Sequence, residues 1–152
     1  MANPIPEGLH SLTPQLSVEG ADKAIDFYKR AFGATEHGRA NDPSGKKVWH
    51  SQLRIGNSAF FVSDTMPGMA PPTQTALWLY SDDVDALFKR AVDAGAKVAM
   101  PLADMFWGDR TGTVTDPWGN RWSIAQHMKD LTPEQMKKAQ DDFVAQMQRQ
   151  KK

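Results

Sequence analysis

The polar and apolar positions of this chain alternate in short runs, and two stretches of helical periodicity interrupt them. In the run Leu12–Val18, apolar residues occupy one side and polar residues the other, which is the pattern of a half-buried strand. Across Ala21–Phe32 the apolar residues instead recur every three or four positions, and Gly33 follows as a C-terminal cap. The chain therefore opens with a predicted strand and an amphipathic helix.

Three more strands are predicted after this helix, over residues 34–40, 47–55 and 58–63. The turn Asn41–Gly45 separates the first two, because it consists of residue types that favour turns. Gly56 and Asn57 suit a tight hairpin between the last two. The first half is thus predicted to have the order β-α-β-β-β.

The second half repeats this order. Thr75–Tyr80 predicts a strand, and a helix that Asp82 or Asp83 caps then runs to Ala94. Residues 108–127 predict two β-runs joined by a turn that contains Pro and Gly.

Two pairs of segments also match at the residue level. Phe27–Ala31 matches Leu87–Ala91 at a shift of 60 residues, from position 27 to position 87. Ile55–Asn57 matches Trp118–Asn120 at a shift of 63, from position 56 to position 119. Since both pairs occur in order at nearly the same spacing, we infer an internal duplication of about 60 residues. The predicted fold class is α+β, with two tandem β-α-β-β-β modules.

A C-terminal helix is predicted after the second module, because Thr132 suits an N-cap and Pro133 the first helical position. Its apolar side should dock on the body or on a partner subunit; the alternative is a loosely held end. The expected organisation is an N-terminal arm, a first module, a linker, a second module and a tail helix, over residues 1–10, 11–64, 65–73, 74–127 and 128–152.

Composition narrows the function classes. The 152 residues fit one domain of ordinary size, and the absence of cysteine excludes disulfides and thiol chemistry. Lys plus Arg equals Asp plus Glu at 18 each, so no net basic field would attract nucleic acid or an anionic membrane. The start of the chain lacks signal-peptide features, and no apolar run approaches the roughly 20 residues of a membrane span. We expect a soluble, cytoplasmic protein without nucleic-acid or membrane partners.

Candidate chemistry lies on the predicted strands. His50 and Gln52 are two residues apart and therefore share a face, where the histidine could move a proton or bind a ligand; the alternative is a structural histidine. Gln15 lies on the polar side of the first strand. Trp78 and Tyr80 alternate with leucines, so we expect them to line a concave side and bind a planar compound, or to fill that space themselves.

A second candidate group begins the hairpin of residues 108–127. Asp109 and Arg110 follow Trp107, and a fixed guanidinium beside an aromatic ring can recognise a carboxylate or a phosphonate. The alternative is an intrachain ion pair that shapes the loop. Trp49, on the face opposite His50, is expected to pack against a helix.

Several segments together resemble the glyoxalase/bleomycin-resistance/dioxygenase (vicinal oxygen chelate) superfamily, and within it the PhnB-like branch. They are Thr13–Val18, Asp26–Ala34, Leu53–Gly56, Asp83–Phe88, Gly108–Arg110 and Asp116–Trp122. The resemblance covers about residues 11–145. It implies two modules that form an incomplete barrel around a cavity, in a homodimer with shared or swapped modules.

Metal-dependent members of that family place His, Gln or Glu on the first and last strands of each module. The positions that match here are Thr13, Phe60, Ala76 and Ser123. Phe and Ala cannot bind a metal, and neutral hydroxyls are poor ligands of divalent ions. We therefore predict no cofactor and no metal at these positions, and Ser123 becomes a candidate ligand-binding residue instead.

Three hypotheses follow. The first is a dimeric protein that binds a hydrophobic or aromatic compound without chemistry. The second is a lyase-, isomerase- or dioxygenase-type enzyme with an atypical site around His50 and Gln52, either holding a divalent metal or using His50 as a base. The third is an interaction module whose own rings fill its cavity.

Overall fold

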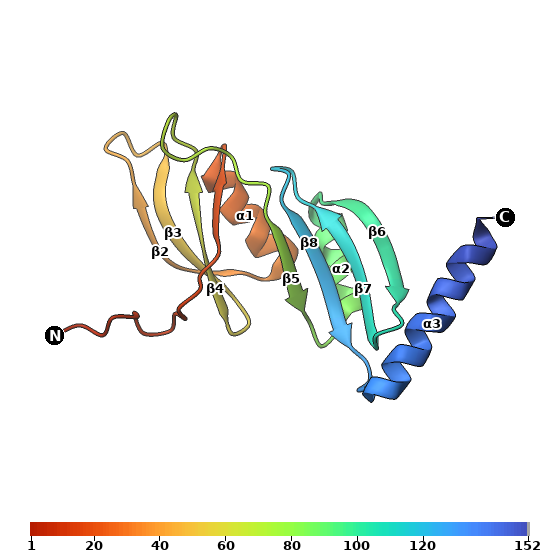
Figure 1. Cartoon of the computed structure of the whole chain (residues 1–152). Helices are drawn as coiled ribbons and strands as arrows, with labels where there is room; N and C mark the ends of the chain where they lie inside the picture. Colours follow the sequence, from red (N-terminus) through yellow and green to blue (C-terminus); the bar gives the residue numbers. More distant parts are fainter. Residues whose placement is uncertain (152) are drawn as a thin grey trace.

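The computed structural model describes residues 1–151, which form eight strands and three helices arranged around two four-stranded sheets (Figure 1). The first half contains β1 (Gln15–Val18), α1 (Ala21–Phe32), β2 (Thr35–Asn41), β3 (Val48–Ile55) and β4 (Ser58–Asp64). The second half contains β5 (Ala76–Tyr80), α2 (Val84–Ala94), β6 (Lys97–Asp104), β7 (Asp109–Thr115) and β8 (Arg121–His127), and the tail forms α3 (Pro133–Gln150).

The two sheets have the same topology. Their strand orders are β1-β4-β3-β2 and β5-β8-β7-β6, with β1–β4 and β5–β8 parallel and the other pairs antiparallel. The predicted fold class, two β-α-β-β-β modules followed by a C-terminal helix, is confirmed. Each sheet stays open, since in the described chain no strand of one sheet pairs with a strand of the other.

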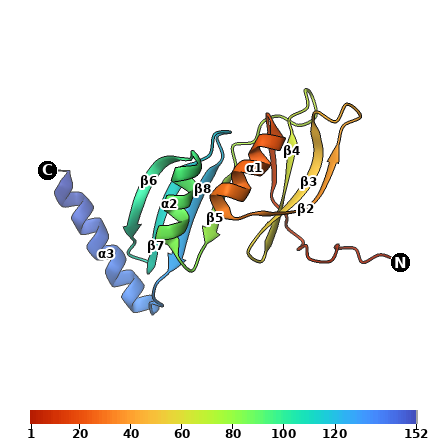
Figure 2. The same ribbon diagram turned by 180° about the vertical axis from the view of Figure 1, so that it is seen from behind.

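Both module helices lie on the same side of the sheets, where α1 and α2 contact each other (Figure 2). This arrangement leaves the other face of each sheet uncovered in a single chain (Figure 1). The core lies between helices and sheets. Its largest fully buried side chains are Tyr28, Phe27, Leu16, Ile25, Leu53, Ile124, Val18, Val48, Val62, Val84, Val114 and Asn120.

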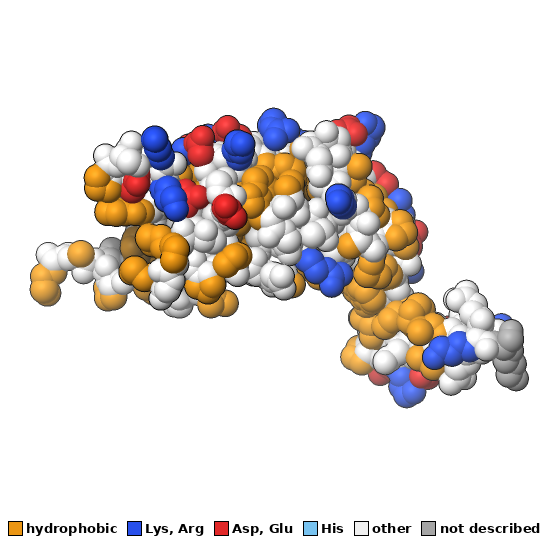
Figure 3. Space-filling model, turned by 90° about the horizontal axis from the view of Figure 1, so that it is seen from above, with side chains coloured by type: hydrophobic (Ala, Val, Ile, Leu, Met, Phe, Trp, Pro, Cys, Tyr) orange, Lys and Arg blue, Asp and Glu red, His pale blue; other side chains and the backbone are white. Residues whose placement is uncertain are grey.

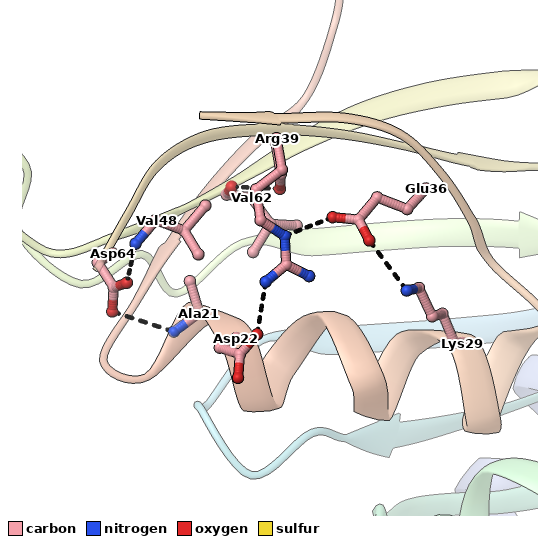
Figure 4. A network of polar contacts seen from close by, with 9 residues as sticks. Ala21, Asp22, Lys29, Glu36, Arg39, Val48, Val62 and Asp64 are labelled. Carbon is pink, nitrogen blue, oxygen red and sulfur yellow. Dashed lines mark hydrogen bonds and ion pairs between the residues drawn. The ribbon is translucent and has the colours of Figure 1, made fainter. Parts of the chain in front are cut away.

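The last strand of each module holds the N-terminus of the module's own helix. The carboxylate of Asp64, the last residue of β4, accepts hydrogen bonds from the backbone N–H groups of Ala21 and Val48 at 3.0 and 2.7 Å (Figure 4). It also accepts from the N–H of Gly20 at 2.9 Å. In the second module, the Gln126 side-chain oxygen accepts from the N–H of Val84 at 3.1 Å. Free N–H groups at a helix start favour such acceptors, so the strand fixes where the helix begins.

Strand β2 is tied to α1 by charged side chains. Arg39 donates hydrogen bonds to the carboxylates of Glu36 and Asp22, and Lys29 donates to Glu36 at 3.0 Å (Figure 4). The bond from Arg39 lowers the pKa of Glu36, and the same bond raises the pKa of Arg39. Because these side chains are partly exposed, the network orients the strand more than it stabilises the fold.

Two strands differ from expectation for local reasons. Pro14 has no N–H to donate, and regular pairing of β1 starts at Gln15 instead of Leu12. Trp49 was expected to face a helix, and this prediction is wrong: the side chain is 51% exposed. The pairing of β2 with β3 is irregular between Ala40 and Asn41, which shifts Trp49 out of the alternation.

The tail helix α3 begins where the sequence predicts. The Thr132 hydroxyl accepts from the N–H of Gln135, whose side chain accepts from the N–H of Thr132. The helix projects from the end of the body opposite the N-terminal arm (Figure 3). Phe143 contacts Phe106 with ring centroids 5.1 Å apart, yet no residue of α3 is buried. The expected tail of 128–152 includes Lys152, which lies outside the described residues.

A membrane span requires a long and strongly apolar helix, and none of the helices in residues 1–151 meets that requirement.

Candidate functional site

The open face of the first sheet gathers three of the predicted site residues. Gln15 pairs with Phe61 across β1 and β4, and Gln52 pairs with the same Phe61 across β3 and β4, so the three side chains lie in one row. The His50 ring lies 4.6 Å from the Phe61 ring between centroids. Their neighbours along the strands, such as Leu53, are buried on the α1 side. The alternation of each strand thus places Gln15, His50 and Gln52 on the uncovered face.

The open face of the second sheet carries aromatic rings and hydroxyls. Trp78 and Tyr80 are 49% and 59% exposed, with ring centroids 6.3 Å apart. Trp78 pairs with Ser123 on β8, and the Ser123 hydroxyl hydrogen-bonds that of Thr113 at 2.9 Å. The pairing places both rings on the open face of this sheet. The two leucines between and beside them, Leu77 and Leu79, pack against the core.

A pocket of about 390 Å³ lies between the two modules. Its lining comes from both halves and consists of His10, Leu12, Thr13, Pro14, Ile55, Gly56, Asn57, Ser58, Ala59, Phe60, Leu77, Trp78, Leu79, Tyr80 and Trp122. Trp78 and Tyr80 therefore border both the pocket and the open face. Among the described residues, the lining does not include His50, Gln52 or Gln15.

Two of the positions that match the family's metal ligands, Phe60 and Ser123, lie on different faces of their sheets, although the repeat shift of 63 makes them equivalent. Phe60 is buried against α1 and Trp122, with its ring 5.9 Å from that of Tyr28, whereas Ser123 lies on the open face, so the two positions are not equivalent. The residue that occupies the place of Ser123 is Phe61. The reason is that the equivalent contacts to the helix starts, from Asp64 in β4 and Gln126 in β8, give a shift of 62 (from 64 to 126), whereas the hairpin turns gave 63.

Replacing Phe60 by Phe61 in this set of four positions adds no side chain that could bind a metal. A phenyl ring at Phe61 and a methyl group at Ala76 offer no metal-binding lone pair, and the hydroxyls of Thr13 and Ser123 are weak ligands. Elsewhere in residues 1–151, His, Asp and Glu side chains do not form a group of three or more that could hold a metal ion.

Asp109 and Arg110 point to opposite faces of the second sheet. The Arg110 guanidinium lies on the α2 side, where it pairs with Asp85 at 2.9 Å and with Asp104 at 3.3 Å. Hydrogen bonds to Asp85 raise the pKa of Arg110, and the same contact lowers the pKa of Asp85. Arg110 therefore forms intrachain ion pairs, which was the alternative interpretation of its role from the sequence.

Asp109 belongs to a polar cluster at one end of the open face. Its buried carboxylate accepts from the Tyr80 hydroxyl at 3.1 Å and lies 2.8 Å from Nδ1 of His127, whose Nε2 lies 2.7 Å from a carboxylate oxygen of Asp130. Hydrogen bonding to Asp130, and then to Asp109, raises the pKa of His127. Partial burial, assisted by Asp109, raises the pKa of Tyr80.

Sequence reasoning did not bring Asp109 and His127 together and missed this cluster. A signal was nevertheless present, because Asp109 and His127 lie equally far from Trp118 in the predicted hairpin and are paired in β7 and β8. Trp107 lies apart from the cluster, in the loop before β7, where its ring meets that of Phe106 at 5.2 Å.

Comparisons with known proteins agree on one family. The family model described as Glyoxalase/Bleomycin resistance protein/Dioxygenase superfamily matches residues 8–124. An uncharacterized protein of Mycobacterium bovis is 40% identical over 139 residues, which cover 85% of this chain and 91% of that protein.

Solved structures show the same fold. TnmS3, an antibiotic binding protein from Streptomyces sp. CB03234, is similar with a TM-score of 0.57 and 27% identity, over 78% of this chain and 97% of TnmS3. A PhnB protein from Bacillus cereus, titled a putative 3-demethylubiquinone-9 3-methyltransferase, shares the fold with a TM-score of 0.59 at 18% identity, over 77% of this chain and 98% of its own. The predicted likeness to PhnB proteins is confirmed for the fold.

Proposed function

Because the chain belongs to the glyoxalase/bleomycin resistance protein/dioxygenase superfamily, we propose that it binds a hydrophobic or aromatic small molecule between its two modules. The proposal is supported by the similarity to TnmS3, an antibiotic binding protein. Since one fold serves many functions, the residues of the site carry more weight than the fold.

The observation that carries the proposal is the position of Trp78 and Tyr80. Both rings are half exposed, side by side, at the border of a pocket of about 390 Å³. Ligand pockets of this size are typically apolar, with a few polar groups that orient the ligand. Here the rings offer stacking surfaces, while the hydroxyls of Thr13 and Tyr80, which donate to His10 and Asp109, are free to accept hydrogen bonds from a ligand.

We further propose that binding needs no metal. The four family positions hold side chains that cannot ligate a divalent ion or do so weakly, as described above. An aromatic compound would then be held by stacking and by burial of its apolar surface, for which about 25 cal/mol per Å² is the usual gain.

The proposal includes a homodimer. The uncovered face of the second sheet exposes the large side chains Trp78, Tyr80 and Met100. Large apolar side chains exposed together on one sheet face favour an interaction site. A second copy placed over the open faces of both sheets would enclose the polar row of Gln15, His50 and Gln52 as well. The lack of cysteine fits a cytoplasmic location, which we include in the proposal.

Fluorescence titration tests the binding function. The probe is 1-anilinonaphthalene-8-sulfonate, an aromatic anion that brightens in apolar pockets, and a panel of aromatic antibiotics then competes for the site. We expect Trp78→Ala and Tyr80→Ala to weaken binding about ten-fold or more each, as the loss of an aromatic contact does. Trp49→Ala is the matched control, since it removes an exposed ring outside the pocket lining. Equal affinity in all four proteins would overturn the proposal.

A second candidate function is an enzyme that uses the first sheet. It is favoured by the position of His50, Gln52 and Gln15 on one open face. Native mass spectrometry of protein purified without chelators separates the two candidates, because it reports bound metal, retained ligand and oligomeric state together. Stoichiometric metal that is lost in His50→Ala would favour the enzyme.

A further inference from the structure

His127 joins the second sheet to the tail helix. It is the last residue of β8. Its Nδ1 lies 2.8 Å from a carboxylate oxygen of Asp109, the first residue of β7. Its Nε2 lies 2.7 Å from Asp130, which belongs to the segment 128–132 that leads into α3. One side chain thus contacts both the sheet and the connection to the helix.

The geometry requires a charged imidazole. A carboxylate only accepts hydrogen bonds, and a neutral imidazole has a single N–H to donate. Both ring nitrogens lie within hydrogen-bonding distance of a carboxylate oxygen, so the two contacts exist together only when both nitrogens carry hydrogen. The arrangement is therefore that of an imidazolium between Asp109 and Asp130.

The backbone beside His127 places this contact at the root of the helix. The N–H groups of Met128 and Lys129 both donate to the carbonyl of Gly108, at 2.9 and 3.2 Å. Asp130 follows these bonds directly and is fully exposed apart from the histidine. The segment is thus tied to the sheet by its backbone up to Lys129, and Asp130, three residues before α3 begins at Pro133, is the first residue beyond these bonds.

We propose that His127 is a protonation-dependent clamp. Its imidazolium holds the segment 128–132 against the second sheet and fixes the direction of α3. When the proton is lost, the remaining N–H stays with the buried Asp109, because that carboxylate has few other donors, and Asp130 is released into water. The helix then samples several directions, together with the apolar side chains Phe143, Val144 and Met147 that it exposes.

The surroundings favour the charged form at neutral pH. The groups that face His127 are Asp109 on β7, Asp130 in the segment, and Asp82, which lines the same hollow as Tyr80 and Gln126. Lys129 is the nearest basic residue along the chain. Because the carboxylates raise the pKa of His127 above its ordinary value of about 6.5, the clamp is complete below that value and is lost as the pH rises through the raised pKa.

The direction of α3 can be measured by distances between spin labels, since the chain has no cysteine of its own. Labels are placed at Ala86→Cys on α2 and Gln146→Cys on α3, both exposed positions, and the labelled chain is diluted with unlabelled protein so that only distances within one chain are measured. We expect a narrow distance distribution below about pH 6.5 and a broad one at alkaline pH.

Two variants make the test specific. Asp130→Asn should broaden the distribution at acidic pH and shift the pKa of His127, followed by NMR, toward its ordinary value. His127→Gln should lose the pH dependence, whereas His37→Gln, which removes an exposed histidine bonded only to Thr35, should keep it. A wild-type distribution that is the same on both sides of the histidine titration, or an unchanged one in Asp130→Asn, would overturn the proposal.

Discussion

The hydroxyl of Tyr28 donates a 2.6 Å hydrogen bond to Oδ2 of Asp116, and this bond joins the two modules. Tyr28 lies on α1 of the first module, and Asp116 begins the turn between β7 and β8 of the second. The same carboxylate accepts from the indole N–H of Trp122 at 3.0 Å and from the N–H groups of Trp118 and Asn120. A buried charge is tolerated here because four donors surround it.

Tyr28→Phe should destabilise the fold by about 1–2 kcal/mol, because it keeps the ring packing and removes one donor from the buried Asp116. Urea unfolding measures the free-energy change. Trp122→Phe removes another donor to the same carboxylate. When it is combined with Tyr28→Phe, the loss of stability should differ from the sum of the two single losses, because both changes act on one acceptor. A change in stability within experimental error for Tyr28→Phe would contradict this view of the module junction.

Gly112→Ala should destabilise the fold by about 1–3 kcal/mol through overpacking. A Cβ at this position of β7 would lie 2.7 Å from the ring of Phe88 on α2 and 3.0 Å from the backbone nitrogen of Leu102 on β6. Gly38→Ala is the control, because Gly38 lies in β2 with open space around it, and it should change stability by less than about 0.5 kcal/mol. Thermal unfolding of both variants decides whether α2 packs as closely on β7 as these distances state.

The sequence predicted those features that depend on local chemistry. The helix Ala21–Phe32 was predicted to the residue, because an amphipathic pattern ended at a glycine that adopts a φ of 69° as a cap. The tail helix followed from Thr132 and Pro133 in the same way. These features need only near neighbours in the chain.

Features that depend on register could not be predicted in the same way. A slip of one residue moves a side chain to the other face, and the repeat shift taken from the turns therefore placed Phe60 where Phe61 lies. The irregular pairing near Asn41 moved Trp49 likewise. The Tyr28–Asp116 bond spans 88 residues, and only the packing of the two modules brings its partners together.

Alkaline titration should show that neither of the two tyrosines ionises at its ordinary pKa of about 10. Burial raises the pKa of Tyr28, and partial burial with the nearby Asp109 carboxylate raises that of Tyr80. Since both values are raised in the folded state, stability should fall as the pH rises above about 10. Ultraviolet absorbance of tyrosinate reports the ionisation. Asp109→Asn should shift the pKa of Tyr80 downward and leave Tyr28 unchanged; a single transition near the ordinary value in the wild type would contradict the prediction.

A charge on the open face of the second sheet should dissociate the proposed homodimer. Met100 pairs with Thr113 on β7, which bonds Ser123, so its half-exposed side chain lies on the same face as Trp78. A glutamate at this position would be desolvated in the interface without a partner, and an unpaired buried charge costs about 3–5 kcal/mol. Sedimentation equilibrium should show a dimer for the wild type and a monomer for Met100→Glu. Ala86→Glu places the same charge on the exposed surface of α2, away from the open face, and should remain dimeric. If the wild type sediments as a monomer at micromolar concentration, the second copy is removed from the proposal, and the pocket between the two modules of one chain must hold the ligand alone.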